Sequence, residues 1–408
     1  MKIISIIVAF IGLFFSFTNF IPISATPVIL IFFIPFFILG RNRFNYIFIS
    51  LFFMLSYFFI SGLLYSPEAF FEYEFYRRDG NVFVTFSFLL TLVLFRYKLN
   101  INMVFDYFLY ATTVINFCCL IMHFTIGNSL YKFFFIGHNA AGGFLMMLTA
   151  ISLSKLLSKH SVTNFLIFSI NLVGLLATDS RGSIIGLFSA MVMLFAYKKG
   201  YEKKGIAIFF VLQLLLYSFL YINAPSGFLS YAYNTYDKSL SYNDWDLSRL
   251  STVIIRGFYL WPRAIYLFLK SPILGTGFGS YNDVPYDLVG KDNFFMYNDG
   301  TVYFDDHHAH NTYLHVLAEN GIIGLILLIF FIYSCNQYIK TIHEKYVFNS
   351  LYLCLWCAIF SSVTEHRFFT PSQMLPFSIL LGLSHIASNY RSKICYQIKS
   401  NISCRDYK

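Results

Sequence analysis

Charged residues are scarce in this chain. Asp, Glu, Lys and Arg make up 12% of its 408 residues, whereas a soluble domain carries about 25%. Hydrophobic residues make up 57%, including 51 Phe and 31 Tyr, and they form long continuous runs. This composition excludes an ordinary soluble protein, and the long runs exclude the short alternating segments of a β-barrel. The sequence therefore predicts an all-α polytopic membrane protein.

Cysteine is also sparse, and its placement excludes several kinds of site. The seven cysteines stand at positions 118, 119, 335, 354, 357, 395 and 404. Cys354 and Cys357 form a CxxC pair inside an apolar run, and no second pair follows at zinc-finger spacing. We interpret this pair as core filling. The long polar segment of the chain contains no cysteine, so no disulfide braces it.

Twelve apolar runs are candidate membrane spans. They cover roughly residues 3–21, 24–39, 44–64, 82–95, 103–124, 139–157, 162–178, 183–197, 205–222, 313–335, 346–363 and 373–388. Two of these runs, 82–95 and 183–197, are short for a hydrocarbon core of about 30 Å. We expect about twelve spans in all. The first run resembles a signal peptide, but another apolar run follows at once, and we expect it to be retained.

The runs divide the chain into four parts. We expect an N-terminal bundle of about nine spans over 1–222, a large polar loop over 223–312, about three spans over 313–388 and a tail over 389–408. Most of the 29 basic residues fall in short connections on the side of the two termini. The positive-inside rule places that side in the cytoplasm, so the large loop faces outward. The net charge of +9 follows from this topology and gives no support to nucleic-acid binding.

One stretch joins polar, titratable residues directly to an apolar run. It reads HHAHNTYLHVLAENGIIGLILLIFFIY over residues 307–333, and His310 and Asn311 stand where the polarity changes. We expect it to pass without a break into a membrane-spanning helix. Gly321 and Gly324 are small enough to admit a neighbouring helix. A titratable histidine at the outer end of such a helix suggests proton-transfer chemistry at the membrane surface.

Basic residues recur at regular spacing in the large loop. Arg249, Arg256, Arg263 and Lys270 are seven residues apart, so one helical face gathers them. The apolar residues between them predict an amphipathic helix at the outer membrane–water interface. Its basic residues either reach lipid headgroups or grip a phosphate, for which the guanidinium fork is suited.

Arg181 stands at a second place on the outer membrane edge. The segment TDSRGS, residues 178–183, joins two spans with almost no loop between them. A charge at the membrane edge is costly unless it is paired, so Arg181 and Asp179 are candidates for a functional site. Alternatively, these two residues form a local ion pair that caps a helix.

Two other polar groups on the outer side are weaker candidates. His138 opens a span in the sequence Gly-His-Asn, where it either lines the same cavity or belongs to a helix cap. Glu365, His366 and Arg367 lie in the last outer loop, and we expect a local ion pair there.

Metal and nucleotide sites have less support. Asp305, Asp306 and the nearby histidines, or Asp244 and Asp246, resemble metal ligands. An Asp-rich loop produces such pairs by chance, and sugar nucleotides are cytoplasmic whereas this loop faces outward, so we expect no metal. The sequence GTGFG, residues 275–279, lacks the context of a nucleotide-binding motif. We expect a tight turn that returns the loop to the membrane.

The pattern that starts at His310 resembles the signature of the O-antigen ligase and polymerase family (WaaL and Wzy). In this pattern His-Asn is followed, after nine residues, by Gly, two residues and Gly. The resemblance extends to SRG at 180–182, the Arg/Trp segment at 249–261 and PILGTGFGSY at 272–281.

This resemblance implies a GT-C-like bundle whose long periplasmic loop contains interfacial helices. It also implies transfer of a glycan from undecaprenyl diphosphate to an acceptor hydroxyl, without a metal or another cofactor. The family's essential arginines fall on Arg181 and Arg256, and its histidine falls on His310. The family's loop arginine stands closer to the tryptophan than Arg256 or Arg249 stands to Trp261 here, so both remain candidates.

The resulting expectation is a multi-pass protein of the bacterial inner membrane with its active site facing the periplasm. The first hypothesis is an O-antigen polymerase, which adds a growing chain to a lipid-linked repeat and works with a chain-length regulator. The alternatives are a ligase that joins the glycan to lipid A–core, a glycan-to-protein transferase, and a flippase for the same lipid. A flippase predicts charges within the spans and recognisable repeat halves, whereas here the spans are nearly free of charge and no internal repeat is found.

Overall fold

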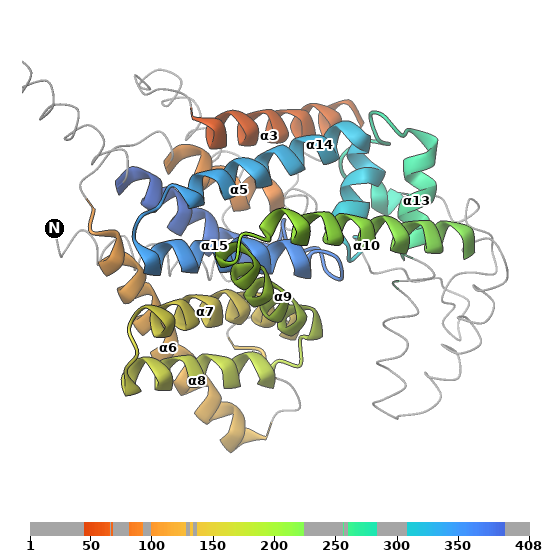
Figure 1. Ribbon diagram of the computed structural model, residues 1–408. Coiled ribbons are helices and arrows are strands. Elements are labelled where there is room, and N and C mark those ends of the chain that lie inside the picture. Colours follow the sequence, from red (N-terminus) through yellow and green to blue (C-terminus); the bar gives the residue numbers. More distant parts are fainter. Residues whose placement is uncertain are drawn as a thin grey trace, which may run out of the picture.

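The computed structural model describes residues 45–65, 67, 81–92, 99–127, 131–133, 137–223, 256, 260–283 and 308–387. All regular structure in these residues is helical (Figure 1). The helices are α3 (Tyr46–Tyr65), α5 (Asn81–Leu92), α6 (Ile101–Ile126), α7 (His138–Ser158), α8 (Val162–Ala177), α9 (Arg181–Lys198), α10 (Glu202–Asn223), α13 (Trp261–Lys270), the 3-10 turn η4 (Ser280–Asp283), α14 (Thr312–Lys340), α15 (Lys345–Ser361) and a last helix over 371–387.

The predicted apolar runs correspond to helices wherever the structure describes them. Each run from 44–64 onward coincides with a helix whose ends agree within a few residues. Five helices, α3, α6, α7, α9 and α14, are long and apolar enough to cross a membrane. The total of about twelve spans stays a prediction. The runs 3–21 and 24–39, the tail 389–408 and most of the loop 223–312 lie outside the described residues.

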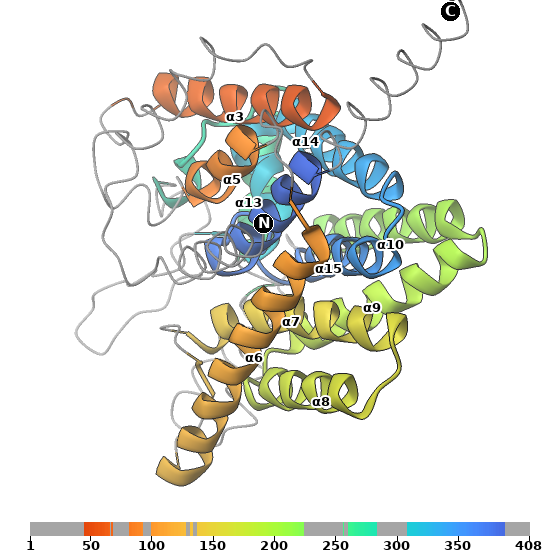
Figure 2. The same cartoon turned by 90° about the vertical axis from the view of Figure 1, so that its left-hand side faces the viewer.

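α15 lies at the centre of the bundle. Its side chains are buried on nearly every face, as expected for a helix that is apolar all round. It packs against α7 and α9, and α7 packs against α8. α3 and α14 pack together on the opposite side of α15, as both views show (Figures 1 and 2).

The two ends of the bundle carry different groups. At one end, Lys155 pairs with Asp106 and Lys340 pairs with Glu202, each with an N···O distance of 2.6 Å. These are lysines that the sequence places on the inner side. At the other end, which we call the site end, α7, α9 and α14 begin and α15 finishes. Of the predicted functional residues, His310, Asn311, Arg181, Asp179, Arg256 and His138 lie at the site end.

α14 is broken at Gly321, so the expectation of an uninterrupted helix is wrong. Gly321 has φ 61° and ψ −163° within an otherwise helical segment. The tight turn over residues 271–279 lies against the break, and its three glycines all have positive φ. Two N–H groups after the break donate to carbonyls of this turn, and two N–H groups of the turn donate to carbonyls before it, at 2.9 to 3.3 Å. The turn therefore replaces helical hydrogen bonds that α14 loses.

Glycine is required at the break by close contact. A Cβ on Gly321 would overlap the carbonyl of Ile273 and would lie 2.6 Å from the nitrogen of Gly275. The segment that packs closely against Gly321 is thus a turn, whereas the sequence led us to expect a helix there. Gly324 does face a helix, because a Cβ there would lie 3.4 Å from Phe58 of α3.

α13 rests on the first turns of α14 through Ala264 and Leu267. Arg263 was expected on a basic face at the membrane surface, but it is only 5% exposed. Its guanidinium lies over the ring of Tyr281, 4.8 Å from the ring centroid. The rest of the expected interfacial helix, including Arg249, lies outside the described residues, so that helix stays a prediction.

Substitution of Gly321 tests the docked turn. Gly321→Ala imposes a side chain at positive φ and also overlaps the turn, so it should lower the free energy of unfolding by about 3 kcal/mol. Gly127→Ala is the matched control, because Gly127 has φ 74° and nothing within 4 Å of an added Cβ. That control should cost about 1 kcal/mol. Thermal unfolding in detergent compares the two variants, and equal shifts in Tm would contradict the docked turn.

Candidate active site

Four parts of the chain meet at the site end. They are the start of α14, the start of α9, Arg256 and the turn over 362–370, which follows α15. Thr312 ties the first turn of α14 to the 362–370 turn. Its N–H donates to the carbonyl of Ser362 at 2.9 Å, and its hydroxyl donates to the carbonyl of Glu365 at 3.3 Å.

Glu365 binds two of the predicted site residues at once. Its Oε1 accepts a hydrogen bond from Nη2 of Arg256 at 2.9 Å, and its Oε2 lies 3.2 Å from Nδ1 of His310. Nη1 of Arg256 donates to the carbonyl of Thr364 at 2.8 Å. Glu365 is 7% exposed, and a buried carboxylate is costly without such partners. One carboxylate therefore brings together a histidine and an arginine that are far apart in the sequence.

The charge state of Glu365 sets the proton position on His310. Burial by itself raises the pKa of Glu365, but the hydrogen bond from His310 and the positive charges of Arg367 and Arg256 outweigh it and hold the pKa well below its usual range. The carboxylate is thus ionised at neutral pH and only accepts hydrogen bonds. Nδ1 of His310 must therefore carry a proton, so in the neutral imidazole the lone pair is on Nε2. This is the tautomer of a general base.

The backbone at His310 bends sharply just before α14. His310 has φ 46°, a left-handed conformation that is uncommon for residues other than glycine. Asn311 follows as the cap of α14 and accepts hydrogen bonds from the N–H groups of Tyr313 and Leu314, both at 3.1 Å. Its Oδ1 also accepts from the hydroxyl of Tyr217 at 3.2 Å. Asn311 thus fixes the bend as a helix cap, which agrees with a supporting role.

Arg367 joins the starts of α7 and α9. It is 2% exposed, and its Nη1 donates to the carbonyl of Asn139 at 2.5 Å. Its Nη2 donates to the hydroxyls of Ser180 and Ser183 at 3.0 and 3.1 Å. The expected local ion pair within residues 365–367 is therefore wrong, because Glu365 pairs with Arg256 and His310 and Arg367 binds other helices.

Arg181 is exposed at the first turn of α9. It has no hydrogen-bond or ion-pair partner among the residues that the structure describes, so the alternative of a pair with Asp179 is not found. Its neighbour Gly182 lies so close to the 362–370 turn that an added Cβ would be 2.7 Å from Thr364 and 3.3 Å from Glu365. The backbone of α9 next to Arg181 therefore lies against the 362–370 turn, and Arg181 itself is exposed at a helix start that favours anions.

The remaining predicted site residues have other places. His138 opens α7 at the site end, next to the Asn139 carbonyl held by Arg367. Gly321 lies at the break of α14 and Gly324 lies against α3, and neither glycine contacts His310. Arg249 lies outside the described residues.

A row of histidines leads from the site into the protein. Ring centroids lie 4.5 Å apart for His310 and His308, 5.0 Å for His308 and His366, and 4.4 Å for His366 and His315. His315 then faces Glu319 at 3.2 Å. Burial, followed by the charges of His315 and His308, holds the pKa of His366 well below its usual range, so His366 is neutral. Within the described part of the chain, no group has the geometry to hold a metal ion.

Comparison with known families identifies one segment of the chain. Residues 166–329 match the family model described as O-antigen ligase (Wzy_C). The match covers about two fifths of the chain and includes Arg181, Arg256 and His310, whereas Glu365 lies beyond it. The family resemblance seen in the sequence is confirmed over this segment. No curated protein matches the chain.

The contacts of Glu365 predict how stability depends on pH. Because its pKa in the folded protein lies below the ordinary value of 4.5, its stabilising effect is complete above pH about 4.5 and is lost as the pH falls further. Wild-type Tm should therefore fall on acidification below pH about 4.5. Glu365→Gln should have a lower Tm at pH 7 and a smaller decline on acidification.

Glu344→Gln, at the opposite end of the bundle, is the control for this experiment and should keep the wild-type decline. Thermal unfolding between pH 7 and pH 3.5 measures all three proteins. A Glu365→Gln curve that runs parallel to the wild-type curve would show that the carboxylate is not held by its charged neighbours.

Proposed function

We propose that this protein is a bacterial membrane glycosyltransferase of the O-antigen type. It transfers a glycan from undecaprenyl diphosphate to the hydroxyl of an acceptor sugar at the periplasmic face of the inner membrane. One observation carries the proposal. A histidine and an arginine share a buried carboxylate at one end of an apolar bundle, where a second arginine is exposed, and all but the carboxylate lie in the segment that matches the O-antigen ligase family.

His310 acts as the general base. Nδ1 donates to Glu365, and Nε2 takes the proton of the acceptor hydroxyl as its oxygen attacks C1 of the donor sugar. The bond between C1 and the diphosphate oxygen breaks, and undecaprenyl diphosphate leaves with the electron pair. Attack from the face opposite the leaving group inverts the anomeric centre. Glu365 stabilises the imidazolium that forms, as a carboxylate does beside a catalytic histidine.

The arginines balance the charge on the leaving group. Among the described residues at the site end, the three guanidinium groups of Arg181, Arg256 and Arg367 outnumber the two carboxylates of Glu365 and Asp179. Arg181 contacts the diphosphate, because its fork has no other partner among the described residues. Arg256 is engaged by Glu365 and Thr364, so it acts by charge and by fixing the carboxylate. Such fixed charges are most effective where charge develops in the transition state.

We propose polymerisation as the activity, with a glycan still attached to its lipid carrier as acceptor. The high aromatic content of 21% supports a polymerase specific for one sugar repeat. A ligase that uses lipid A–core as acceptor is the second candidate, because the matching family model is described as O-antigen ligase. The chemistry at His310 is the same for both acceptors.

Lipopolysaccharide from a deletion strain tests the function. Loss of the gene should leave core carrying a single repeat, and the wild-type gene should restore the ladder of chain lengths. His310→Ala should not restore it, because loss of a general base slows transfer by about 10²- to 10⁴-fold. His160→Ala, an exposed histidine between α7 and α8, should restore the full ladder.

Each outcome of this experiment has a clear meaning. Bare core with long chains left on the carrier would identify a ligase. Bare core without long chains on the carrier would identify a flippase and would contradict the transferase. A normal ladder with His310→Ala would remove the proposed base.

A further inference from the structure

Three histidines beyond His310 lie in a row that the proposed mechanism does not use. His308, His366 and His315 follow His310 with ring centroids 4.4 to 5.0 Å apart. They come from two parts of the chain, the start of α14 and the 362–370 turn. A ring at this separation can bring a nitrogen to its neighbour by rotating about its side-chain bonds. Rows of titratable residues inside membrane proteins are typical of proton transfer.

The row ends at a second buried carboxylate, Glu319. Oε2 of Glu319 lies 3.2 Å from Nε2 of His315, and its Oε1 accepts a hydrogen bond from the N–H of Tyr281 at 3.1 Å. The carboxylate stabilises a proton on the nitrogen that faces it, so in the neutral imidazole of His315 the lone pair is on Nδ1. This Nδ1 is buried and has no hydrogen-bond partner among the described residues. His315 can therefore take up a further proton.

The two ends of the row differ in charge. At the His310 end, Arg256 donates to the carboxylate of Glu365 at 2.9 Å, and the positive charge of Arg367 also acts on it. The negative charge of Glu365 is therefore already offset when a proton reaches His310. At the far end, the ion pair of Glu319 is with a histidine of the row itself, and a third guanidinium group lies over the Tyr281 ring. Movement along the row therefore takes the proton away from two guanidinium groups and toward a carboxylate.

His366, in the middle of the row, holds no proton at rest. Burial, followed by the charges of His315 and His308, keeps its pKa well below the usual range. Its Nδ1 is buried and has no hydrogen-bond partner in the described part of the chain. Such an atom is costly in a folded protein unless it has a use. A proton can therefore pass through His366 but does not stay there.

We propose that this row is a proton relay, which carries the proton of the acceptor hydroxyl from His310 to His315. The source of the proton rests on the proposed function. His310 gives the proton held on Nε2 to His308. His308 then gives a proton from its other nitrogen to His366, and His366 passes one to Nδ1 of His315. His310 is then neutral again, and His315 is an imidazolium beside Glu319.

An internal route for the proton suits this reaction. Water that reached C1 of the donor would hydrolyse it, so a filled site that excludes water prevents this loss. The relay resets His310 without admitting water. The proton returns along the row to solvent after the product leaves.

Removal of one ring tests the relay. The full-length protein in phospholipid nanodiscs transfers glycan from undecaprenyl diphosphate, and kcat and KM are measured at fixed pH and ionic strength. His366→Ala should lower kcat about tenfold and leave KM unchanged, because His310 then loses its proton only by slower exchange with water. Imidazole in solution should restore kcat, since it fits the space left by the ring and carries a proton.

Pyrrole is the matched control additive. Its ring has the same size as imidazole but no basic nitrogen, so it fills the space without carrying a proton, and kcat of His366→Ala should stay low. The control variant is His385→Ala, a buried histidine beside Tyr338 near the other end of α14. Its kcat should equal that of the wild type and should not respond to imidazole.

A second variant keeps the test independent of packing around His366. His315→Gln retains a side chain that can donate to Glu319, but an amide does not carry a proton at neutral pH. It should show a similar loss of kcat and a larger solvent isotope effect on kcat than the wild type.

Two results would overturn the relay. Wild-type kcat in both row variants would show that His310 exchanges its proton directly with water. Restoration of His366→Ala by imidazole and pyrrole equally, or by neither, would show that His366 serves only packing. Absence of transfer by the wild-type protein would instead contradict the proposed function, so the two failures are distinguishable.

Discussion

The bridge from His310 to Arg256 through Glu365 is the interaction on which the site depends. A buried carboxylate is tolerated because charged partners surround it, and loss of one partner of a buried pair typically costs 3 to 5 kcal/mol. This requirement holds the start of α14, the 362–370 turn and the loop arginine together. The same bridge sets the tautomer of His310, so one interaction determines both where the base stands and which nitrogen can accept a proton.

A second constraint holds α14 in position beneath that bridge. The break at Gly321 lets the turn over 271–279 pair with the α14 backbone. α13, which directly precedes this turn in the chain, packs against the first turns of α14. The first turns of α14 thus form a separate short helix, braced by backbone hydrogen bonds and capped by Asn311. This short helix carries His310 at its start. The proposed position of the base follows from it.

Features set by local sequence were predictable. Long apolar runs predicted helices from α3 onward because each run is as long as a membrane span. The GTGFG turn was predictable because glycines favour positive φ. His310, Arg181 and Arg256 were proposed as site residues from the family resemblance and because titratable residues at the edge of a membrane are costly without a role. His315 and Glu319 carried a usable signal, since residues four apart share a helix face.

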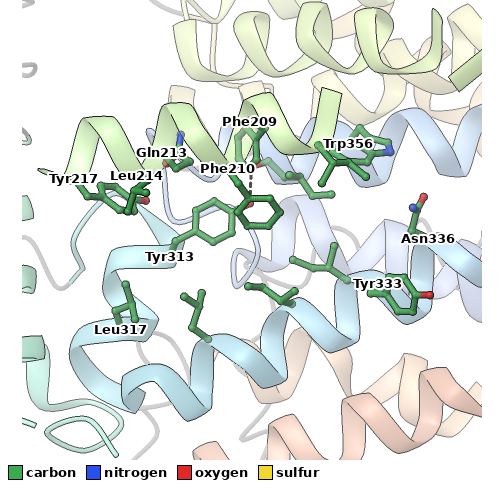
Figure 3. Close-up of a pocket in the computed structure, with 15 residues that line it drawn as sticks. Phe209, Phe210, Gln213, Leu214, Tyr217, Tyr313, Leu317, Tyr333, Asn336 and Trp356 are labelled. Carbon is green, nitrogen blue, oxygen red and sulfur yellow. Dashed lines mark hydrogen bonds between the residues drawn. The ribbon is translucent and has the colours of Figure 1, made fainter. Parts of the chain in front are cut away.

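Features set by contacts between distant segments were not predictable. Glu365 binds His310, just before α14, and Arg256, whereas Arg367 binds the starts of α7 and α9. The local sequence favoured an ion pair between Glu365 and Arg367, which the fold does not form. The break at Gly321 depends on a turn some forty residues earlier in the chain. An apolar groove of about 380 Å³ between α10, α14 and α15 (Figure 3) depends on how these three helices pack together, which no single helix encodes.

A double-mutant cycle between His310 and Glu365 tests the central claim most directly. Wild type, His310→Ala, Glu365→Gln and the double variant are compared by kcat/KM for transfer from a purified undecaprenyl-diphosphate glycan. If Glu365 acts through His310, the double variant should lose no more activity than His310→Ala alone. Losses that multiply in the double variant would mean that the two residues act independently, and the account of the site would be wrong.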